Sequence, residues 1–361
     1  MAHDFDIAII GAGIAGASLA AELASSARIV LLEAEDRPGY HTTGRSAAFW
    51  TESYGGPGVQ PLTTASGPFL RDGGFLTPRG ALTIGRSGQE ARIDHFAQRF
   101  AELGVAVEQL DRAAIASRIP GLKAMWTAGA LEPDCCDIDV GALHHHYLHN
   151  ARKGGVEIRS RARLTGADRD VQGWKLDLES GETLTCEVLV NAAGAWADGI
   201  AEMADVAPLG IAPLRRTVAQ LQVSPPVMDS LPLVLDVDEK FYFKPESGRL
   251  WLSPHDETPS PPCDAAPDEI DVALAIHRLE GVVDWRVERV ESRWAGLRSF
   301  APDRLPVYGY DPLSPQFFWF AGQGGFGIQT APAAARLAAG LILNEPGGEI
   351  DPGRYAPGRF A

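Results

Sequence analysis

The chain has 361 residues, of which 45% are hydrophobic and 22% are charged, and its formal net charge is −15. This length allows two domains with a large core, and the composition is that of an ordinary globular protein. Because an acidic protein repels nucleic acid and anionic lipid, we expect neither as a partner, and an anionic ligand must be held by locally placed arginines.

The chain opens on an apolar run that ends in a glycine-rich turn. Residues 5–10 have the pattern of a buried strand. Gly11, Gly13 and Gly16 follow with the spacing G-x-G-x-x-G, and then come an alanine-rich helix and a second strand that ends at Glu33. This order is typical of a dinucleotide-binding unit, in which the glycines admit a pyrophosphate to the helix N-terminus and the acid accepts the ribose hydroxyls. An acid at this place disfavours the 2′-phosphate of NADP.

The sequence shows no sign of export or of membrane insertion. The first strand leaves no room for a signal peptide, and no stretch has the ~20 apolar residues of a membrane helix. The four cysteines lack the C-x-x-C spacing of redox or zinc sites. We therefore expect reduced cysteines and a cytoplasmic protein that is at most peripheral to a membrane.

Loops with recognisable composition follow the first unit. A run rich in Gly, Thr and Ser at 36–48 predicts a loop that leads into a short helix, and its Arg45 and Ser46 could meet a second phosphate. An aromatic and glycine-rich loop at 49–58 could cover a pocket and move. Further elements are predicted as strands at 74–77 and 81–85, a helix at 89–103, and a short helix capped by Asp111.

A helix predicted at 139–153 carries four histidines, which are His144, His145, His146 and His149. Consecutive histidines on a helix point in different directions, and no cysteine or carboxylate partner accompanies the pairs that share a face. We therefore predict no metal site here, and we interpret the element as a helix that is partly surface and partly core.

The second half begins with strands and ends on another glycine-rich turn. An antiparallel meander is predicted over 157–186, and a buried strand at 188–191 ends in the small residues 192–194. Residues 294–302 read as a loop after a strand, and a strand at 316–321 enters glycines 322, 324, 325 and 327 before a helix at 330–343. We expect an α/β fold whose Rossmann-like domain is discontinuous, over 1–80, 133–212 and 292–361, with an inserted mixed or antiparallel sheet domain over 81–132 and 213–291.

Together these motifs resemble the D-amino acid oxidase (DAO) superfamily of FAD-dependent flavoproteins, over nearly the whole chain. The resemblance rests on segments 10–16, 44–48, 190–196, 295–300 and 322–330, with Glu33 and Asp303, and within the superfamily it is greatest to bacterial D-arginine dehydrogenase. It implies FAD, held without a covalent bond because no cysteine stands where sarcosine oxidases attach their flavin. The residues implied to bind FAD are Gly11, Gly13, Ile14, Ala15, Gly16, Glu33, Arg45, Ser46, Ala47, Ala48, Ala193, Gly194, Gly296, Gly324, Gly325, Phe326, Gly327, Ile328, Gln329 and Thr330.

The same resemblance implies a reaction and a set of site residues. A D-amino acid would pass a hydride from Cα to flavin N5, and the imino acid would hydrolyse to a 2-oxo acid and ammonia, with dioxygen or a quinone as electron acceptor. The matching site residues are Arg298, Tyr242 and Arg216 for the carboxylate, Tyr54 as a mobile lid residue, and Gly325 and Gln329 near the substrate amine and the flavin.

Two departures from D-arginine dehydrogenase bear on the substrate. Phe49 replaces a His of its substrate loop, and Ala81 stands where a Glu pairs with the substrate guanidinium. We therefore predict an aliphatic or aromatic D-amino acid rather than D-arginine. Two alternatives stay open, a secondary-amine or glycine oxidase acting on sarcosine or similar N-methyl amino acids, and a flavin-binding redox sensor without turnover. Arg298 and Tyr242 argue against the sensor, because it needs no carboxylate clamp.

Overall fold

The unit predicted at the start of the chain is present in the computed structural model, which describes residues 3–169, 171–345 and 348–360. Strand β1 (Phe5–Ile10), helix α1 (Ile14–Leu23) and strand β2 (Ile29–Leu32) follow one another, and the two strands pair in parallel. The turn between β1 and α1 contains Gly11 and Gly13, as the spacing predicts.

The first large sheet is built around β1. Its order is β10-β11-β12-β1-β2-β9, with β20 beside β12 and β19 beside β20. Strands β9, β2, β1, β12 and β20 are parallel to one another, as in a dinucleotide-binding sheet. The other strands of this sheet are β9 (Glu157–Arg159), β10 (Leu164–Arg169), β11 (Trp174–Leu178), β12 (Thr183–Asn191), β19 (Val307–Tyr310) and β20 (Phe317–Ala321).

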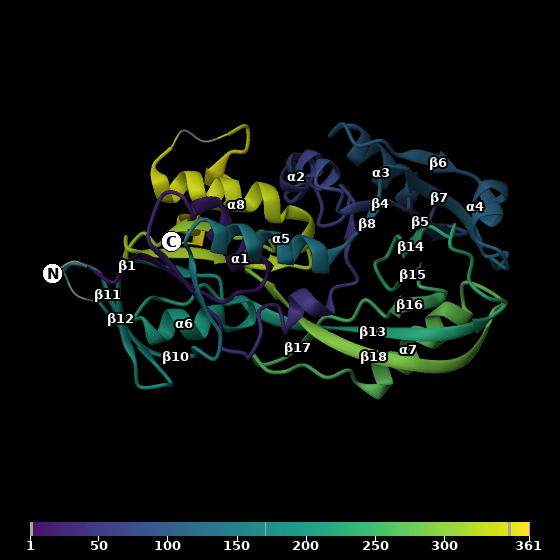
Figure 1. Cartoon of the computed structure of the whole chain (residues 1–361). Coiled ribbons are helices and arrows are strands. Elements are labelled where there is room, and N and C mark those ends of the chain that lie inside the picture. Colours follow the sequence, from purple (N-terminus) through teal and green to yellow (C-terminus); the bar gives the residue numbers. More distant parts are fainter. Residues whose placement is uncertain (1–2, 170, 346–347, 361) are drawn as a thin grey trace.

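Each face of this sheet has its own cover. Ile7 and Ile9 pack in a core with α1, α5 (Val140–Lys153) and α8 (Gly327–Leu343), whereas Ala8 and Ile10 pack with the β10–β11 hairpin and α6 (Ala197–Met203). Successive side chains of a strand point to opposite faces, which explains the division. Figure 1 shows α1, α5 and α8 together on one side of the strands and α6 on the other.

The second large sheet has the order β21-β18-β13-β16-β15-β14-β5-β7-β6, with β17 beside β13. Apart from β21, it is built from residues 81–132 and 212–300, and β18 crosses the domain boundary proposed at 292. Its strands are β5 (Ala81–Arg86), β6 (Glu108–Leu110), β7 (Trp126–Glu132), β13 (Ala212–Ser224), β14 (Leu233–Asp236), β15 (Tyr242–Glu246), β16 (Arg249–Ser253), β17 (Thr258–Pro259), β18 (Arg286–Phe300) and β21 (Gln323–Gly324). Three helices accompany it, α3 (Glu90–Ala101), α4 (Arg112–Arg118) and α7 (Glu269–Glu280).

A small third sheet joins the aromatic loop to the rest of the chain. Strand β3 (Phe49–Trp50) pairs with β8 (Cys136–Ile138), which also pairs with β4 (Leu76–Pro78). Helix α2 (Gln60–Asp72) follows this loop and lies against α8, where Ser66 Oγ accepts a bond from the backbone of Ala333. Short 3-10 helices lie at Thr42–Arg45, Gly194–Trp196, Pro352–Tyr355 and Pro357–Phe360.

Two local predictions differ from the structure, and one helix was not predicted. Residues 294–300, predicted as a loop, belong to β18, because this strand pairs with β13 along almost its whole length. The strand at 157–159 does not join the antiparallel meander but pairs in parallel with β2. Helix α2 was not predicted, since prolines at 61 and 68 break its helical pattern.

Two predicted helix starts are confirmed. Asp111 accepts a bond from the backbone N–H of Ala114, and Asp139 from that of Ala142, so both acids cap the helices that they precede. Over the described part of the chain, no helix combines the length and the apolar character needed to cross a bilayer.

Candidate active site

One cavity of about 430 Å³ reaches from the carboxyl ends of β1 and β2 to the second sheet. At one end its walls include Gly11, Gly13 and Glu33, and at the other end Arg216 and Arg298. The cavity therefore joins the predicted dinucleotide site to the predicted carboxylate clamp.

The glycine turn brings backbone very close to backbone. Gly11 has φ +99°, and a side-chain carbon there would lie 2.6 Å from the carbonyl oxygen of Ala192. At Gly16 such a carbon would lie 1.9 Å from the carbonyl oxygen of Gly11, so helix and strand pack together only with glycine. These contacts fit the predicted roles, a turn that larger residues cannot make and a cradle left open for a phosphate.

Glu33 is held in place by backbone donors. Its Oε2 accepts a 3.0 Å bond from Ala12 N and its Oε1 a 3.0 Å bond from Glu35 N. The buried carboxylate lines the cavity at the end of β2. Its place and its fixed orientation fit a ribose of a bound dinucleotide.

One residue of the histidine run supports the glycine turn, a role that the sequence analysis missed. The Nε2 of His144 lies 2.9 Å from the carbonyl oxygen of Ala12. Burial lowers the pKa of His144, which favours a neutral ring that donates this bond. His146 contacts Asn150, and the rings of His145 and His149 stack on one another. No spacing rule links a histidine on a distant helix to the turn.

The predicted phosphate contact of Arg45 stays a prediction. The residue lines the cavity, but its Nη1 donates to the carbonyl oxygens of Ala265 and Ala295, and its Nη2 pairs with Asp264. These bonds fasten the 3-10 helix of residues 42–45 to β18 and to the chain before α7. The Oγ of Ser46 likewise accepts a bond from the nearby Ala48 N.

The predicted cofactor residues separate into two groups. Those that line the cavity are Gly11, Gly13, Ile14, Ala15, Glu33, Arg45, Ser46, Ala47, Ala193, Gly194, Gly296, Gly324, Gly325, Gly327 and Ile328. Those outside its walls are Gly16, Ala48, Phe326, Gln329 and Thr330. Thr330, for example, turns its hydroxyl to the Phe326 carbonyl oxygen within α8, so its side chain serves the helix.

Strand register brings the predicted clamp together. Arg216 of β13 pairs with Gly296 of β18, and Arg298 lies two residues further on, so both arginines project from the same face. Tyr242 of β15 lies deeper in the sheet, and all three side chains line the cavity.

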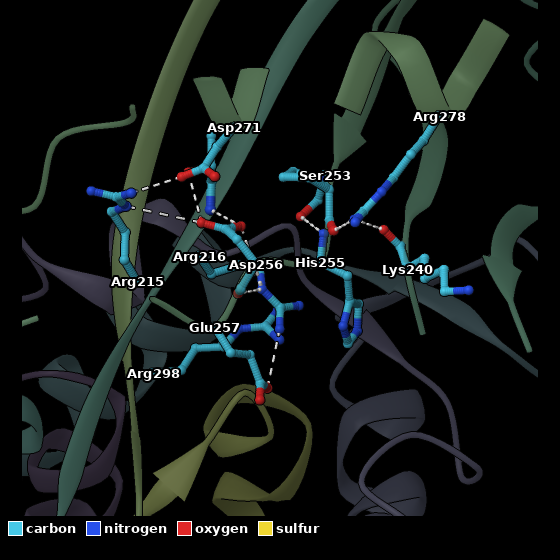
Figure 2. A network of polar contacts seen from close by, with 12 residues as sticks. Arg215, Arg216, Lys240, Ser253, His255, Asp256, Glu257, Asp271, Arg278 and Arg298 are labelled. Carbon is cyan, nitrogen blue, oxygen red and sulfur yellow. Dashed lines mark hydrogen bonds and ion pairs between the residues drawn. The ribbon is translucent and has the colours of Figure 1, made fainter. Parts of the chain in front are cut away.

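Two polar atoms at this end of the cavity have no partner within the described chain. They are Arg216 Nη1, on a side chain whose residue is 3% exposed, and the hydroxyl of Tyr242, which is 1% exposed. The other donors of Arg216 are used, because its Nε donates to the Asp256 carbonyl oxygen at 2.7 Å and its Nη2 lies 3.3 Å from Glu257 Oε1 (Figure 2). Buried polar groups are rarely left unpaired, so these two atoms point to a ligand.

Arg298 is held by Tyr54 and by a glycine. Its Nη1 donates a 2.5 Å bond to the Tyr54 hydroxyl, although Tyr54 is not among the residues that line the cavity. A side-chain carbon at Gly325 would lie 2.8 Å from the same nitrogen, so a glycine is needed for Arg298 to take this position.

His255 belongs to this end of the site and was missed by the sequence analysis. Its ring is perpendicular to that of Tyr242, with centroids 5.8 Å apart, and Figure 2 shows it beside Arg216 and Arg298. Burial, with the charges of those two arginines, lowers the pKa of His255 to about 2. The imidazole is therefore neutral, and the potential at this end of the cavity is positive.

Phe49 closes the space beyond the clamp. Its ring meets Tyr54 edge-on at 5.2 Å and Tyr242 at 5.9 Å between centroids. It is buried in a cluster with Ala81 and Cys135. Among the described residues that line the cavity Phe49 is absent, so the cavity ends before this wall.

Glu132, which lies beside Ala81, directs a buried carboxylate at the aromatic loop. Glu132 pairs with Ala81 across β5 and β7 and is 2% exposed. Its oxygens accept bonds from the Thr51 and Ser53 hydroxyls, both 2.6 Å, and from the backbone N–H groups of Glu52 and Ser53. This carboxylate is thus engaged by the loop.

Gln329 holds the same loop from the other side. Its Nε2 donates to the Tyr54 carbonyl oxygen at 3.1 Å and to the Thr63 hydroxyl, and its Oε1 accepts a long bond from Thr51 N. The structure therefore brings Gln329 to the backbone of Tyr54, and Gln329 is not among the residues that line the cavity. Its predicted place near the substrate amine stays a prediction.

A parallel sheet with a glycine turn, a buried acid after the second strand and a cavity that ends at two arginines define a dinucleotide-dependent oxidoreductase of the Rossmann-like class. The chain belongs to the DAO family of FAD-dependent oxidoreductases, whose profile matches residues 6–341. FAD is therefore its cofactor, and oxidation of amines or amino acids is typical of this family.

The relatives span nearly the whole chain. Hydrogen cyanide synthase subunit HcnC of Pseudomonas aeruginosa is 24% identical and is matched over 96% of this chain and 94% of its own length. Glycine oxidase of Geobacillus kaustophilus is 25% identical, over 95% of this chain and 94% of its length. These relatives support the superfamily but not a particular kinship with D-arginine dehydrogenase.

Solved structures share the fold. The crystal structure of the Geobacillus glycine oxidase has a TM-score of 0.86 at 21% identity and covers 98% of both chains. L-Proline dehydrogenase from P. horikoshii has a TM-score of 0.87 at 20% identity, over 100% of this chain and 98% of that one. The predicted α/β class, with a Rossmann-like FAD-binding domain and a mixed-sheet substrate domain, is confirmed.

Proposed function

We propose that this chain oxidises glycine or a small N-alkylated glycine such as sarcosine, with FAD as the hydride acceptor. The observation that carries the proposal is a pair of buried donors, Arg216 Nη1 and Tyr242 Oη, beside Arg298 in one cavity. Neither donor has a partner among the residues that the structure describes. Three donors that converge in this way suit a carboxylate, and a bidentate guanidinium contact adds orientation to affinity.

The positive potential of the clamp also suits the chemistry of the amine. Arg216 and Arg298 disfavour any further cation nearby, and together with burial, the larger cause, they lower the pKa of His255. A substrate amine bound beside them would lose its proton more easily than in water. Bound FAD accepts a hydride from the carbon that bears the amine, and this transfer needs a neutral amine.

The aromatic wall favours a small substrate. Phe49, packed against Tyr54 and Tyr242, occupies the space that a large side chain at Cα would need. The glycine oxidase of Geobacillus kaustophilus, one of the relatives, is named for a substrate of this small size. An aliphatic or aromatic D-amino acid, which the sequence favoured, is therefore the less supported substrate. D-Arginine is disfavoured as well, because the carboxylate of Glu132 is already engaged by four donors.

Rates over a substrate panel test the proposal. The holoenzyme is mixed anaerobically with glycine, sarcosine, D-alanine, D-leucine, D-phenylalanine and D-arginine, and bleaching of the flavin is followed. We expect glycine or sarcosine to reduce the flavin fastest, and D-leucine and D-phenylalanine at least tenfold more slowly. A substrate that is one or two groups too large for its pocket loses about 1–3 kcal/mol of transition-state binding free energy. Preference for a large D-amino acid contradicts the proposed class, and no bleaching by any amine favours the redox sensor.

A matched pair of variants tests the role of the wall. Phe49→Ala should raise the rate with D-leucine relative to glycine by roughly tenfold, because it opens the space beyond Tyr242. Phe96→Ala, which truncates a partly buried ring of α3 away from the cavity, should leave this ratio unchanged. An unchanged ratio in a folded, flavin-loaded Phe49→Ala protein would remove Phe49 as the determinant of size.

Two further properties are part of the proposal. We propose that the FAD is not covalently attached, so acid precipitation should leave the yellow colour in the supernatant. Reoxidation of the bleached enzyme by dioxygen or by a soluble quinone identifies which of the two is the electron acceptor.

A further inference from the structure

Glu257 is a charged residue at the clamp that the proposed reaction does not use. It follows β16 in the chain, and its Oε1 lies 3.3 Å from Arg216 Nη2 and 2.7 Å from Arg304 Nη2. Its side chain is 31% exposed, whereas that of Arg216 is 4% exposed. Figure 2 shows the carboxylate of Glu257 directed at the Arg216 guanidinium.

A bound carboxylate would have to share Arg216 with Glu257. The fork of Arg216 is rigid and planar. Its Nη2 is engaged by Glu257, and its Nη1 has no partner in the part of the chain that the structure describes. A ligand carboxylate on Nη1 would therefore lie next to a second negative charge, within the width of one guanidinium group. Like charges at this separation in a largely buried site repel one another.

Arg304 keeps Glu257 in this place. Its guanidinium is half-exposed and lies over the Phe300 ring, 4.0 Å from the ring centroid. The 2.7 Å contact with Arg304 is shorter than the 3.3 Å contact with Arg216. Glu257 therefore has a partner whether or not Arg216 turns to a ligand, and its charge stays beside the clamp.

We propose that Glu257 sets the affinity of the site for carboxylates, because it partly neutralises Arg216 in the free protein and repels the ligand carboxylate once it is bound. Glu257 is thus a specificity-determining residue that lowers affinity for monocarboxylates and selects against ligands with a second carboxylate. This inference rests on the carboxylate clamp of the proposed function.

Binding of acetate to the holoenzyme tests the inference without turnover. Acetate is the probe, and its dissociation constant is measured from the perturbation of the flavin absorption spectrum. In Glu257→Gln and in Glu257→Ala we expect acetate to bind roughly tenfold more tightly than in the unaltered protein, since both variants remove the charge. Glu288→Gln is the control, because Glu288 is 33% exposed and pairs with Arg286 at the far end of β18.

The two variants distinguish repulsion of the ligand carboxylate by Glu257 from a role of Glu257 in positioning Arg216. If Glu257 merely held Arg216 in position, Glu257→Gln would bind acetate like the unaltered protein and Glu257→Ala would bind it more weakly, and either result overturns the inference. With glycine, we expect KM to fall in both variants while kcat changes less than twofold. If acetate perturbs the flavin of neither the unaltered protein nor the variants, the carboxylate clamp itself is wrong, and the inference is lost with it. Acetate binding without tightening in the variants overturns only the inference.

Discussion

A single hydroxyl, that of Tyr242, gives the sharpest test at the scale of the residue. Because this buried group has no partner within the described chain, its removal costs the folded protein no hydrogen bond, whereas a bound carboxylate would lose a donor. Tyr242→Phe should lower kcat/KM for glycine about 10- to 100-fold, which corresponds to ~1.5–3 kcal/mol for a bond to a charged group. The thermal midpoint should stay the same or rise.

The control for this variant is another buried tyrosine. Tyr147 of α5 also has a hydroxyl without a partner among the described residues, but it lies in the core between helices. Tyr147→Phe should leave both kcat/KM and the dissociation constant of acetate unchanged. An equal loss in both variants would mean that the effect is one of packing and not of carboxylate binding.

Site residues that stand in a recognisable motif could be predicted from the sequence. Site residues that reach the cavity only through packing between distant segments could not. Arg298 and Tyr242 stand in segments that resemble the superfamily, so both were predicted at the site, and both line the cavity. His255 and Glu257 belong to no motif. They reach the clamp only because β16 and β17, between which they lie in the chain, both pair with β13, the strand of Arg216. Gln329 was predicted near the substrate, and in the structure its amide donates to the backbone of Tyr54.

At the scale of the element, the segment 51–54 depends on Glu132. This carboxylate accepts four bonds from residues 51–53, and Tyr54 at the end of the segment holds Arg298. In Glu132→Gln an amide NH₂ replaces one acceptor oxygen, so donors of the segment lose their partner at about 1–3 kcal/mol each. We expect a lower free energy of unfolding and a KM for glycine that rises roughly three- to tenfold as Tyr54 loosens.

A double-mutant cycle measures whether Glu132 acts through Tyr54. In a Tyr54→Phe background, which already lacks the bond to Arg298, Glu132→Gln should raise KM for glycine less than twofold, because groups that act in series are not additive. The loss of stability should persist in both backgrounds. If the effects of the two substitutions on KM were fully additive, Glu132 would not act on Arg298 through Tyr54.

Elements were predictable where local pattern and tertiary pairing agree. The glycine turn and α5 follow their own local pattern and caps, so their bounds lie close to those expected. Residues 294–300 carry small and polar residues that suggest a loop, yet the ladder with β13 extends them as a strand. In α2 the prolines hide a helix that packing against α8 stabilises.

At the scale of the whole molecule, a strongly acidic protein concentrates positive charge inside. The net charge is −15, yet Arg216 and Arg298 meet at one buried site, and the face of the second sheet carries both. The net charge follows from composition alone. The meeting of Arg216 and Arg298 follows only from the register of β13 on β18. This internal charge should affect stability, because it helps to lower the pKa of the buried His255 held beside it.

His255 makes that effect measurable as a dependence of stability on pH. Its pKa in the folded protein is lowered to about 2, against an ordinary value near 6.5, so below pH ~6.5 the unfolded chain takes up a proton that the folded chain does not. The free energy of unfolding should therefore fall as the pH is lowered from 7 to 5, with His255 contributing up to about 1.4 kcal/mol per pH unit.

His255→Asn removes this group and suits the backbone, since the residue has φ +55° and asparagine tolerates that region. Denaturant unfolding at pH 7, 6 and 5 should give a shallower slope for His255→Asn than for the unaltered protein. His95→Asn, on the exposed side of α3, should keep the original slope. Equal slopes for His255→Asn and the unaltered protein would show that His255 is not held neutral by its burial and its arginine neighbours.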